Sequence, residues 1–268
     1  MIALRRTVYV AGIAMLCAWV LVPIYLVALG AFGGRLGAFK WPKTILPTDA
    51  SIAAFMAFLR IEGVWNAALN SLIAAGFTML FSIALGAPAG YALARYTFRG
   101  QDAFRLLVLL TRAFPLAILA LPLTVLFIRV GLYDTPLGVS LVHTALALPF
   151  AALVTASLFA GIPRELEEAA WVFGCTRAQA FRKVVVPLAL PGLTAAAIFA
   201  FVISWNEVFA ASVLTVRERT LTAYLLTVLS ESPLHFRLAG GFLLIVPSVA
   251  FIFAVRKYLF AMWGITNR

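Results

Sequence analysis

Long apolar runs separated by short polar stretches make up most of this chain. Six of the runs are long enough to cross a bilayer as a helix, which takes about 20 residues. The pattern predicts six transmembrane helices, near residues 8–30, 66–93, 104–128, 138–160, 191–213 and 238–260. We find no internal repeat and no low-complexity linker, so we expect a single transmembrane domain over residues 1–268.

The composition supports a membrane protein. The chain is 64% hydrophobic and 12% charged, whereas a soluble domain is about half apolar and about a quarter charged. Its net charge of +11 comes from short basic groups between apolar runs, a pattern typical of cytoplasmic loops rather than of a nucleic-acid-binding surface. We therefore expect contact with a lipid bilayer and none with nucleic acid.

The first apolar run imitates a secretory signal peptide, because Arg5 and Arg6 precede it. A signal peptide has only about 7–15 apolar residues, however, and this run extends from Val8 to Ala31. A retained first transmembrane helix is the better interpretation. The basic residues are more numerous in the loops that share a side with the N-terminus, which predicts that both termini are cytoplasmic in the inner (cytoplasmic) membrane.

One charged segment, residues 161–190, interrupts the apolar pattern and is predicted to be cytoplasmic. Its first half has the signals of a short helix: Pro163 suits a first helical position, and acids at 165, 167 and 168 favour the positive end of the helix dipole. Gly174 can end this helix in a left-handed conformation. The apolar positions fall on one stripe at helical spacing, namely Leu166, Ala169, Ala170 and Phe173.

A second short helix is predicted directly after Gly174. Thr176 and Gln179 have the spacing of a capping box. We expect this helix to stop at Pro187 and Pro191, because proline lacks the backbone N–H that continues a helix.

The same segment carries a resemblance. Glu168-Ala169-Ala170, three residues, Gly174, nine residues and Val184-x-Val186-Pro187 resemble the EAA-x3-G-x9-I-x-L-P loop of permease subunits in bacterial ABC importers, and more narrowly those of the maltose-type carbohydrate group. Other fragments agree with this group in order and spacing: Asn70-Ser71-Leu72, Ala92-Leu93-Ala94-Arg95-Tyr96, Gly131-Leu132-Tyr133-Asp134-Thr135, Ile162-Pro163-x-Glu165-Leu166 and Ser204-Trp205-Asn206-Glu207.

The resemblance implies the type I ABC importer permease fold, which is all-α with six transmembrane helices and a cytoplasmic helical coupling loop. It also implies three kinds of partner: a second homologous permease subunit, two ATPase subunits and an extracytoplasmic solute-binding protein. The coupling loop would sit in a groove of an ATPase subunit. The residues expected to make this contact are Leu166, Glu168, Ala169, Ala170, Phe173, Gly174 and Pro187.

The chain lacks the Gly-x-x-x-x-Gly-Lys-Ser/Thr loop that cradles nucleotide phosphates. We therefore expect a non-catalytic transport subunit with no cofactor of its own, and ATP and Mg bound by the partner ATPase. A metal site is not expected either, because Cys17 and Cys175 have no partner at ligand spacing.

Charged groups at membrane depth are candidates for function, because they are costly to bury in lipid. Trp205, Asn206 and Glu207 are predicted to line the substrate pathway, since an indole face beside polar groups suits a sugar; a contact with a neighbouring helix is the alternative. Arg112 has two interpretations: its side chain reaches the membrane interface, or it has a functional role. His143 is interpreted first as a helix–helix contact.

The function predicted is that of an ABC importer permease for a carbohydrate or related solute. An ion-coupled secondary transporter is the alternative. Such a transporter requires midplane carboxylates, usually in repeated halves, whereas Glu207 is the one acid within the six predicted helices.

Overall fold

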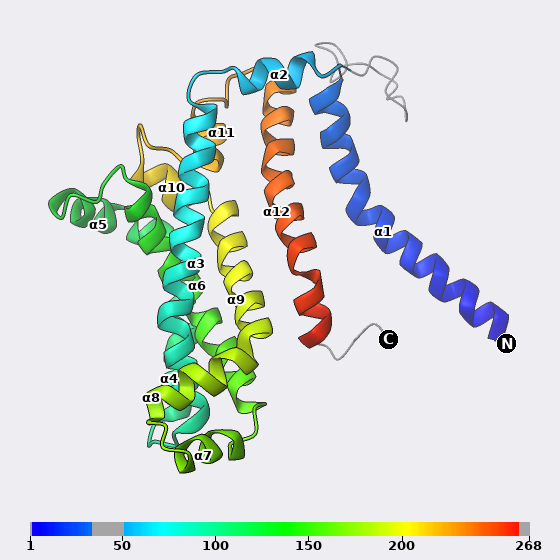
Figure 1. Ribbon diagram of the computed structural model, residues 1–268. Coiled ribbons are helices and arrows are strands. Elements are labelled where there is room, and N and C mark those ends of the chain that lie inside the picture. Colours follow the sequence, from blue (N-terminus) through cyan, green and yellow to red (C-terminus); the bar gives the residue numbers. More distant parts are fainter. Residues whose placement is uncertain (1, 34–50, 263–268) are drawn as a thin grey trace. The chain divides into compact units, whose positions relative to one another are not determined.

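The structure, a computed structural model, describes residues 2–33 and 51–262, and these are largely helical (Figure 1). The longer helices are α1 (Ile2–Phe32), α3 (Val64–Arg95), α5 (Leu116–Arg129), α6 (Pro136–Ala160), α9 (Val186–Asn206) and α12 (Leu234–Met262). The shorter ones are α2 (Ala53–Leu59), α4 (Gln101–Leu110), α7 (Glu165–Val172), α8 (Arg177–Ala180), α10 (Phe209–Leu214) and α11 (Leu221–Thr227). In the described residues, five helices are long and apolar enough to cross a membrane, or six if one bent pair forms a single span. The predicted all-α membrane fold is confirmed.

The described residues divide into two compact units. The first combines residues 1–65 with 224–247, and the second combines 66–223 with 248–268, apart from the positions that the structure does not describe. The division by itself does not test the expected single transmembrane domain, which stays a prediction.

Aromatic packing holds the first unit together. The ring of Phe32 at the end of α1 lies 5.0 Å from that of Phe242 in α12 and 5.2 Å from that of Phe55 in α2. The hydroxyl of Tyr224 donates a hydrogen bond to the carbonyl oxygen of Glu62 at 2.6 Å.

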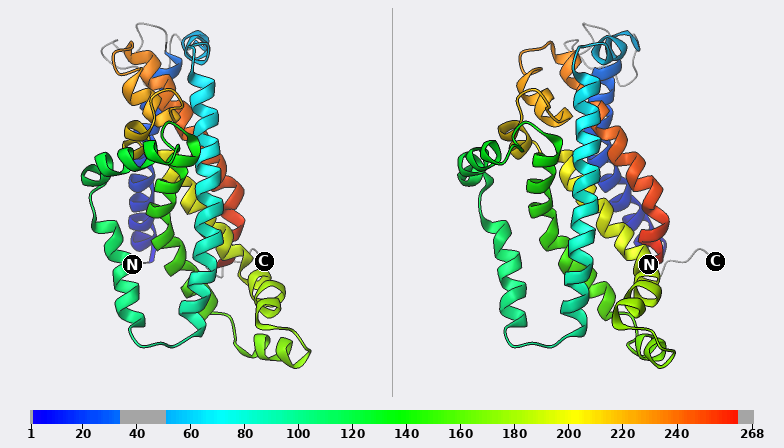
Figure 2. Two further views of the ribbon diagram at one scale, coloured as in Figure 1. Left: turned by 90° about the vertical axis from the view of Figure 1, so that its left-hand side faces the viewer. Right: turned by 60° about the vertical axis from the view of Figure 1, so that its left-hand side comes forward.

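In the second unit α3, α6 and α9 run side by side (Figures 1 and 2). Glycines of α3 allow the closest approach: a Cβ atom on Gly90 would lie 2.7 Å from the backbone nitrogen of Ala156 and 2.8 Å from the carbonyl oxygen of Ala152. Thr155 of α6 also donates its hydroxyl to the carbonyl of Gly86 at 2.9 Å. Small residues and interhelical hydroxyl bonds of this kind stabilise helix pairs where lipid removes most of the hydrophobic driving force.

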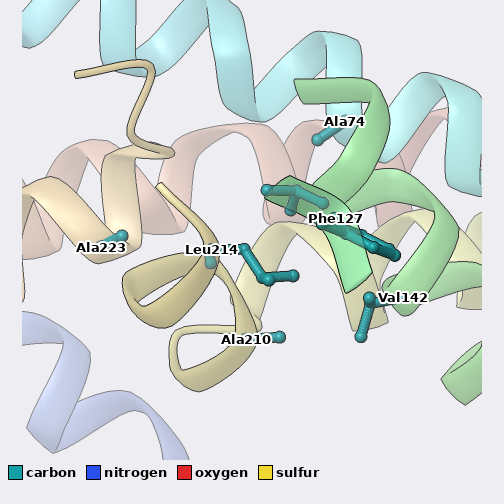
Figure 3. Packing of buried hydrophobic residues seen from close by; sticks show 8 residues of the cluster. Ala74, Phe127, Val142, Ala210, Leu214 and Ala223 are labelled. Carbon is teal, nitrogen blue, oxygen red and sulfur yellow. The ribbon is translucent and has the colours of Figure 1, made fainter. Parts of the chain in front are cut away.

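A buried apolar cluster forms a second set of contacts between the helices of this unit. Figure 3 shows Phe127 of α5 beside Val142 of α6 and Leu214 of α10. The cluster consists of Ala74, Phe127, Val139, Val142, Ala210, Ala211, Leu214 and Ala223. It anchors α5 and α10 to α3 and α6.

The single helix predicted near 104–128 is divided into two helices, α4 and α5. α4 ends in a 3-10 turn, η1 (Thr111–Ala113), and the axis then bends by 86° into α5. Pro115 explains the bend, because a proline disfavours helical geometry at the preceding residue, and Phe114 is extended at φ −73° and ψ 120°. Arg112 therefore lies exposed in the turn and not inside a continuous helix.

The fifth predicted helix, 191–213, is also displaced. The helical path starts at Arg177 and continues through α8, a π-helical turn η2 (Phe181–Val185) and α9 to Asn206. The stop predicted at Pro187 and Pro191 does not occur. Pro187 lies in the first turn of α9, at the point where the helical hydrogen-bond pattern changes from π to α. The wider turn of η2 directly precedes this point.

Candidate functional site

The predicted coupling segment forms α7, a sharp turn and α8 at the end of the second unit where α3 ends and α4 begins (Figure 1). Gly174 has φ +84°, so the predicted left-handed turn is confirmed. The N–H of Gly174 donates to the carbonyl of Trp171 at 2.9 Å, and the N–H of Cys175 donates to that of Ala170 at 3.0 Å. These two bonds form a Schellman motif, which satisfies carbonyls at the end of α7 and reverses the chain.

The tip of α7 carries its most exposed apolar side chains. Val172 is 85% exposed and Phe173 is 88% exposed. Leu166 and Ala169 of the predicted stripe are also exposed, whereas Ala170 is half-buried. Large apolar side chains this accessible, clustered at one tip, are a candidate interaction surface.

Glu168 and the second short helix also match local expectations. Glu168 is exposed and pairs with Arg164 one turn earlier at 3.6 Å. The capping box is present: Thr176 Oγ1 accepts from the N–H of Gln179 at 3.3 Å, and the side chain of Gln179 accepts from the N–H of Thr176 at 2.9 Å. Pro187 lies beyond this turn, at the start of α9.

Glu167 is the functional candidate that sequence reasoning missed. It is 1% exposed. Its carboxylate accepts hydrogen bonds from the Tyr91 hydroxyl and from Nε of Arg95, each at 2.5 Å. Tyr91 and Arg95 lie one turn apart near the end of α3, a visible polar pair, but their partner is 72 residues further along the chain than Arg95.

The second candidate set lies at the C-terminal end of α9, where three consecutive residues, Trp205, Asn206 and Glu207, face different surroundings. Trp205 is 2% exposed and its ring stacks on that of Phe201 with a centroid distance of 5.9 Å. Asn206 is exposed, and its amide donates to the carbonyl of Val202 at 2.9 Å. Glu207 ends α9 in an extended conformation.

Glu207 holds a buried polar network together. Its carboxylate accepts backbone N–H bonds from Phe209, Ala210 and Ala211 at 2.9, 3.0 and 3.2 Å, and so caps the start of α10. Its Oε2 also lies 2.9 Å from Nε2 of His143. The break between α9 and α10 therefore has a definite cause, because the carboxylate satisfies N–H groups that would otherwise be unpaired.

His143 makes a helix–helix contact, as the sequence indicated. Its Nδ1 lies 2.7 Å from Oγ of Ser204. Thr78 of α3 donates to the same oxygen at 3.2 Å, so that α3, α6 and α9 meet in one network. The assignment of Trp205, Asn206 and Glu207 to the substrate pathway stays a prediction.

The different environments of Asn206 and Glu207 lead to a test. Asn206→Ala removes an exposed amide, and we expect normal accumulation of the permease. If Asn206 lines the substrate pathway, this variant should slow uptake without changing the melting temperature. Glu207→Gln removes the charge from the carboxylate that contacts His143 and caps α10, and we expect the melting temperature of the purified protein to fall. Unchanged melting in both variants, with uptake slowed only by Glu207→Gln, would contradict the capping role.

The motif fragment at residues 131–135 forms a turn with a clear structural task. Asp134 has φ +58°, and its Oδ1 accepts N–H bonds from Val216, Arg217 and Glu218 at 2.8, 2.9 and 3.0 Å. Partial burial would raise the pKa of this carboxyl, but the three N–H bonds and Arg217 outweigh it and hold the pKa below its usual value. Asn70 supports the same loop by donating to Glu218 at 2.9 Å.

Comparisons with known proteins agree with this architecture. Residues 82–261 match the family described as "Binding-protein-dependent transport system inner membrane component". The trehalose transport system permease protein SugB of Mycobacterium tuberculosis is 33% identical over 83% of this chain and 83% of its own length. The diacetylchitobiose uptake system permease protein DasC of Streptomyces coelicolor is 31% identical over 69% of this chain and 67% of its own.

A solved structure shares the fold at lower identity. A chain of a bacterial ABC transporter involved in the import of the acidic polysaccharide alginate superposes with a TM-score of 0.77 at 21% identity, covering 96% of both chains. The fold, the family match and the two relatives lead to one assignment. This chain belongs to the family of binding-protein-dependent transport system inner membrane components, the permease subunits of ABC importers.

Proposed function

We propose that this permease imports a carbohydrate or a related solute. Relatives named for trehalose and diacetylchitobiose uptake support a carbohydrate cargo. We further propose that a binding protein delivers the solute. A similarly folded chain comes from an alginate transporter in complex with an alginate pentasaccharide-bound periplasmic protein. Family membership argues against the ion-coupled secondary transporter that the sequence left as the alternative.

The permease is proposed to work with a second homologous permease subunit and two ATPase subunits. ATP and Mg would bind to the ATPase chains, and this chain would contribute no catalytic residue. Both termini would be cytoplasmic, which places α7 and α8 on the side where soluble ATPase subunits can reach them.

The observation that carries the coupling role is the exposed apolar tip of α7. Val172 and Phe173 project beyond a helix that is tied down at one buried residue. Leu166, Ala169 and Ala170 extend this surface along the helix. The two alanine side chains are small enough for an ATPase subunit to approach the helix closely. Glu168 and Pro187 complete the expected contact set, with Gly174 as the turn.

A cysteine in place of Phe173 tests both the orientation and the docking. In a background with Cys17→Ser and Cys175→Ser, we expect this cysteine to be shielded from an impermeant maleimide in intact cells. A reagent that joins a thiol to a nearby lysine amine should then cross-link it to an ATPase subunit in isolated membranes.

The control is a cysteine in place of Glu231, which is exposed between α11 and α12. It should react with the maleimide in intact cells and give no cross-link to the ATPase. Reversed labelling of the two positions would refute the orientation. Correct labelling without any ATPase cross-link from position 173 would refute the coupling role of α7.

A further inference from the structure

The buried carboxylate of α7 suggests how motion passes from this helix into the membrane. All eight residues of α7 are described, and Glu167 alone among them is buried. Its neighbours Leu166 and Glu168 are exposed. A carboxylate is seldom fully buried unless it is paired, so the contact that Glu167 makes is specific.

Both oxygens of Glu167 bind the same helix. Oε2 accepts from the hydroxyl of Tyr91, and Oε1 accepts from Nε of Arg95. These two donors are four residues apart and therefore lie on one face of α3. Arg95 also donates from Nη2 to the carbonyl of Ile162 at 3.0 Å, which fixes the chain just before α7.

Tyr91 extends the contact to the π-helical turn. Its ring lies 4.6 Å from that of Phe181 in η2 and 5.8 Å from that of Phe159 at the end of α6. The end of α3 is thus packed against both sides of the coupling segment. No other residue of α7 is buried against the membrane helices.

We propose that Glu167, Tyr91 and Arg95 are positioning residues that lock α7 to α3, so that a displacement of α7 by the ATPase moves α3 directly. This proposal rests on the proposed docking of α7 to the ATPase. The three residues do not belong to the docking surface, because their polar groups face into the protein. They act on the transmission of movement and not on the affinity for the ATPase.

The experiment measures how α3 responds to nucleotide at its far end. A cysteine in place of Asn66, an exposed residue near the start of α3, is labelled with maleimide in the reconstituted permease–ATPase complex. The background again lacks Cys17 and Cys175. Labelling rates are compared between the nucleotide-free complex and the complex trapped with ATP and vanadate.

We expect the rate to differ between the two states in the complex with intact Glu167. In Glu167→Gln and in Tyr91→Phe, most of this difference between the two labelling rates should be lost, because each variant removes one contact between α7 and α3. Tyr91→Phe keeps the ring that packs on Phe181. Both variants should still cross-link to the ATPase through a cysteine in place of Phe173.

Glu165→Gln is the matched control, because it removes an exposed acid from the first turn of the same helix. It should leave the response unchanged. Arg95→Gln alone should reduce the labelling response more than Arg95→Gln combined with Glu167→Gln. The single variant leaves a buried carboxylate without its cation, whereas the double variant does not.

If position 173 gives no cross-link to the ATPase even when Glu167 is intact, the proposed docking of α7 to the ATPase is itself contradicted. An intact cross-link together with a normal response in Tyr91→Phe and Glu167→Gln would overturn only the positioning role. The positioning role would also be overturned if, in the complex with intact Glu167, the labelling rate at position 66 were the same with and without nucleotide. If Glu167→Gln fails to accumulate, Tyr91→Phe decides by the same criteria.

Discussion

Gly90→Ala is expected to lower the melting temperature of the purified permease by up to roughly 8 °C. The added Cβ would lie 2.7 and 2.8 Å from backbone atoms of α6, which cannot move aside as a side chain can. Overpacking of this kind costs about 1–3 kcal/mol, and each kcal/mol corresponds to about 2–4 °C in a domain of this size class. The gain in helix propensity from glycine to alanine, about 1 kcal/mol at most, is subtracted from this cost and leaves a net destabilisation of up to about 2 kcal/mol.

Gly76→Ala provides the matched control for this prediction. It is the same substitution in the same helix, and nothing lies within 4 Å of the new Cβ. We expect its melting temperature to be unchanged or slightly raised, because alanine is the better helix former. Equal melting temperatures for Gly90→Ala and Gly76→Ala in one detergent would show that α3 and α6 are not in close contact at Gly90.

Ala169→Asp is expected to abolish uptake while the permease still inserts in the membrane at normal levels. Ala169 is exposed on α7, so the new carboxylate costs little in the free subunit. In a protein groove it would be buried without a partner. Such a charge costs roughly 3 kcal/mol or more, which lowers the affinity for the ATPase at least about 100-fold.

Co-purification of the ATPase and uptake across a panel of radiolabelled sugars measure this effect together. Ala178→Asp, an exposed position on α8 outside the proposed surface, is the control and should retain both properties. Normal uptake by Ala169→Asp with the ATPase fully bound would mean that this face of α7 is solvated in the assembled transporter.

Gly174→Val tests the turn that follows α7 rather than the proposed docking surface of α7. A β-branched residue at φ +84° is strained by about 1–3 kcal/mol, which should misdirect the turn and lower uptake. Gly174→Asn should be better tolerated, because asparagine adopts left-handed conformations more readily. Equal uptake by both variants would argue against any need for the Schellman turn.

Local signals accounted for the membrane class and for the coupling segment. Apolar runs of spanning length, the acids in the first turn of α7, the glycine after it and the capping box of α8 all depend on residues a few positions apart. Short-range hydrogen bonds of this kind are specified by sequence alone. The ordered motif fragments added the family, which residues 82–261 confirm.

The boundaries of two spans required more than hydrophobicity. The apolar run over 104–128 continues across Pro115, although the backbone bends there by 86°. Conversely, prolines at 187 and 191 do not stop the helix that leads into α9. A proline removes one donor in either case, and the surrounding packing decides whether the chain bends or continues.

Only the tertiary structure identified the partners of the buried charged groups. Glu167 finds Tyr91 and Arg95 across 72 residues or more, and Glu207 finds His143 across 64. Sequence spacing predicts neighbours within one helix, but it does not predict which faces of two distant helices meet. A buried carboxylate must be satisfied by whatever donors the fold brings to it. The sequence therefore determined that this is a membrane permease with a short charged helix–turn–helix segment between two spans, whereas helix packing decided that Glu167 binds α3 and that Glu207 caps α10.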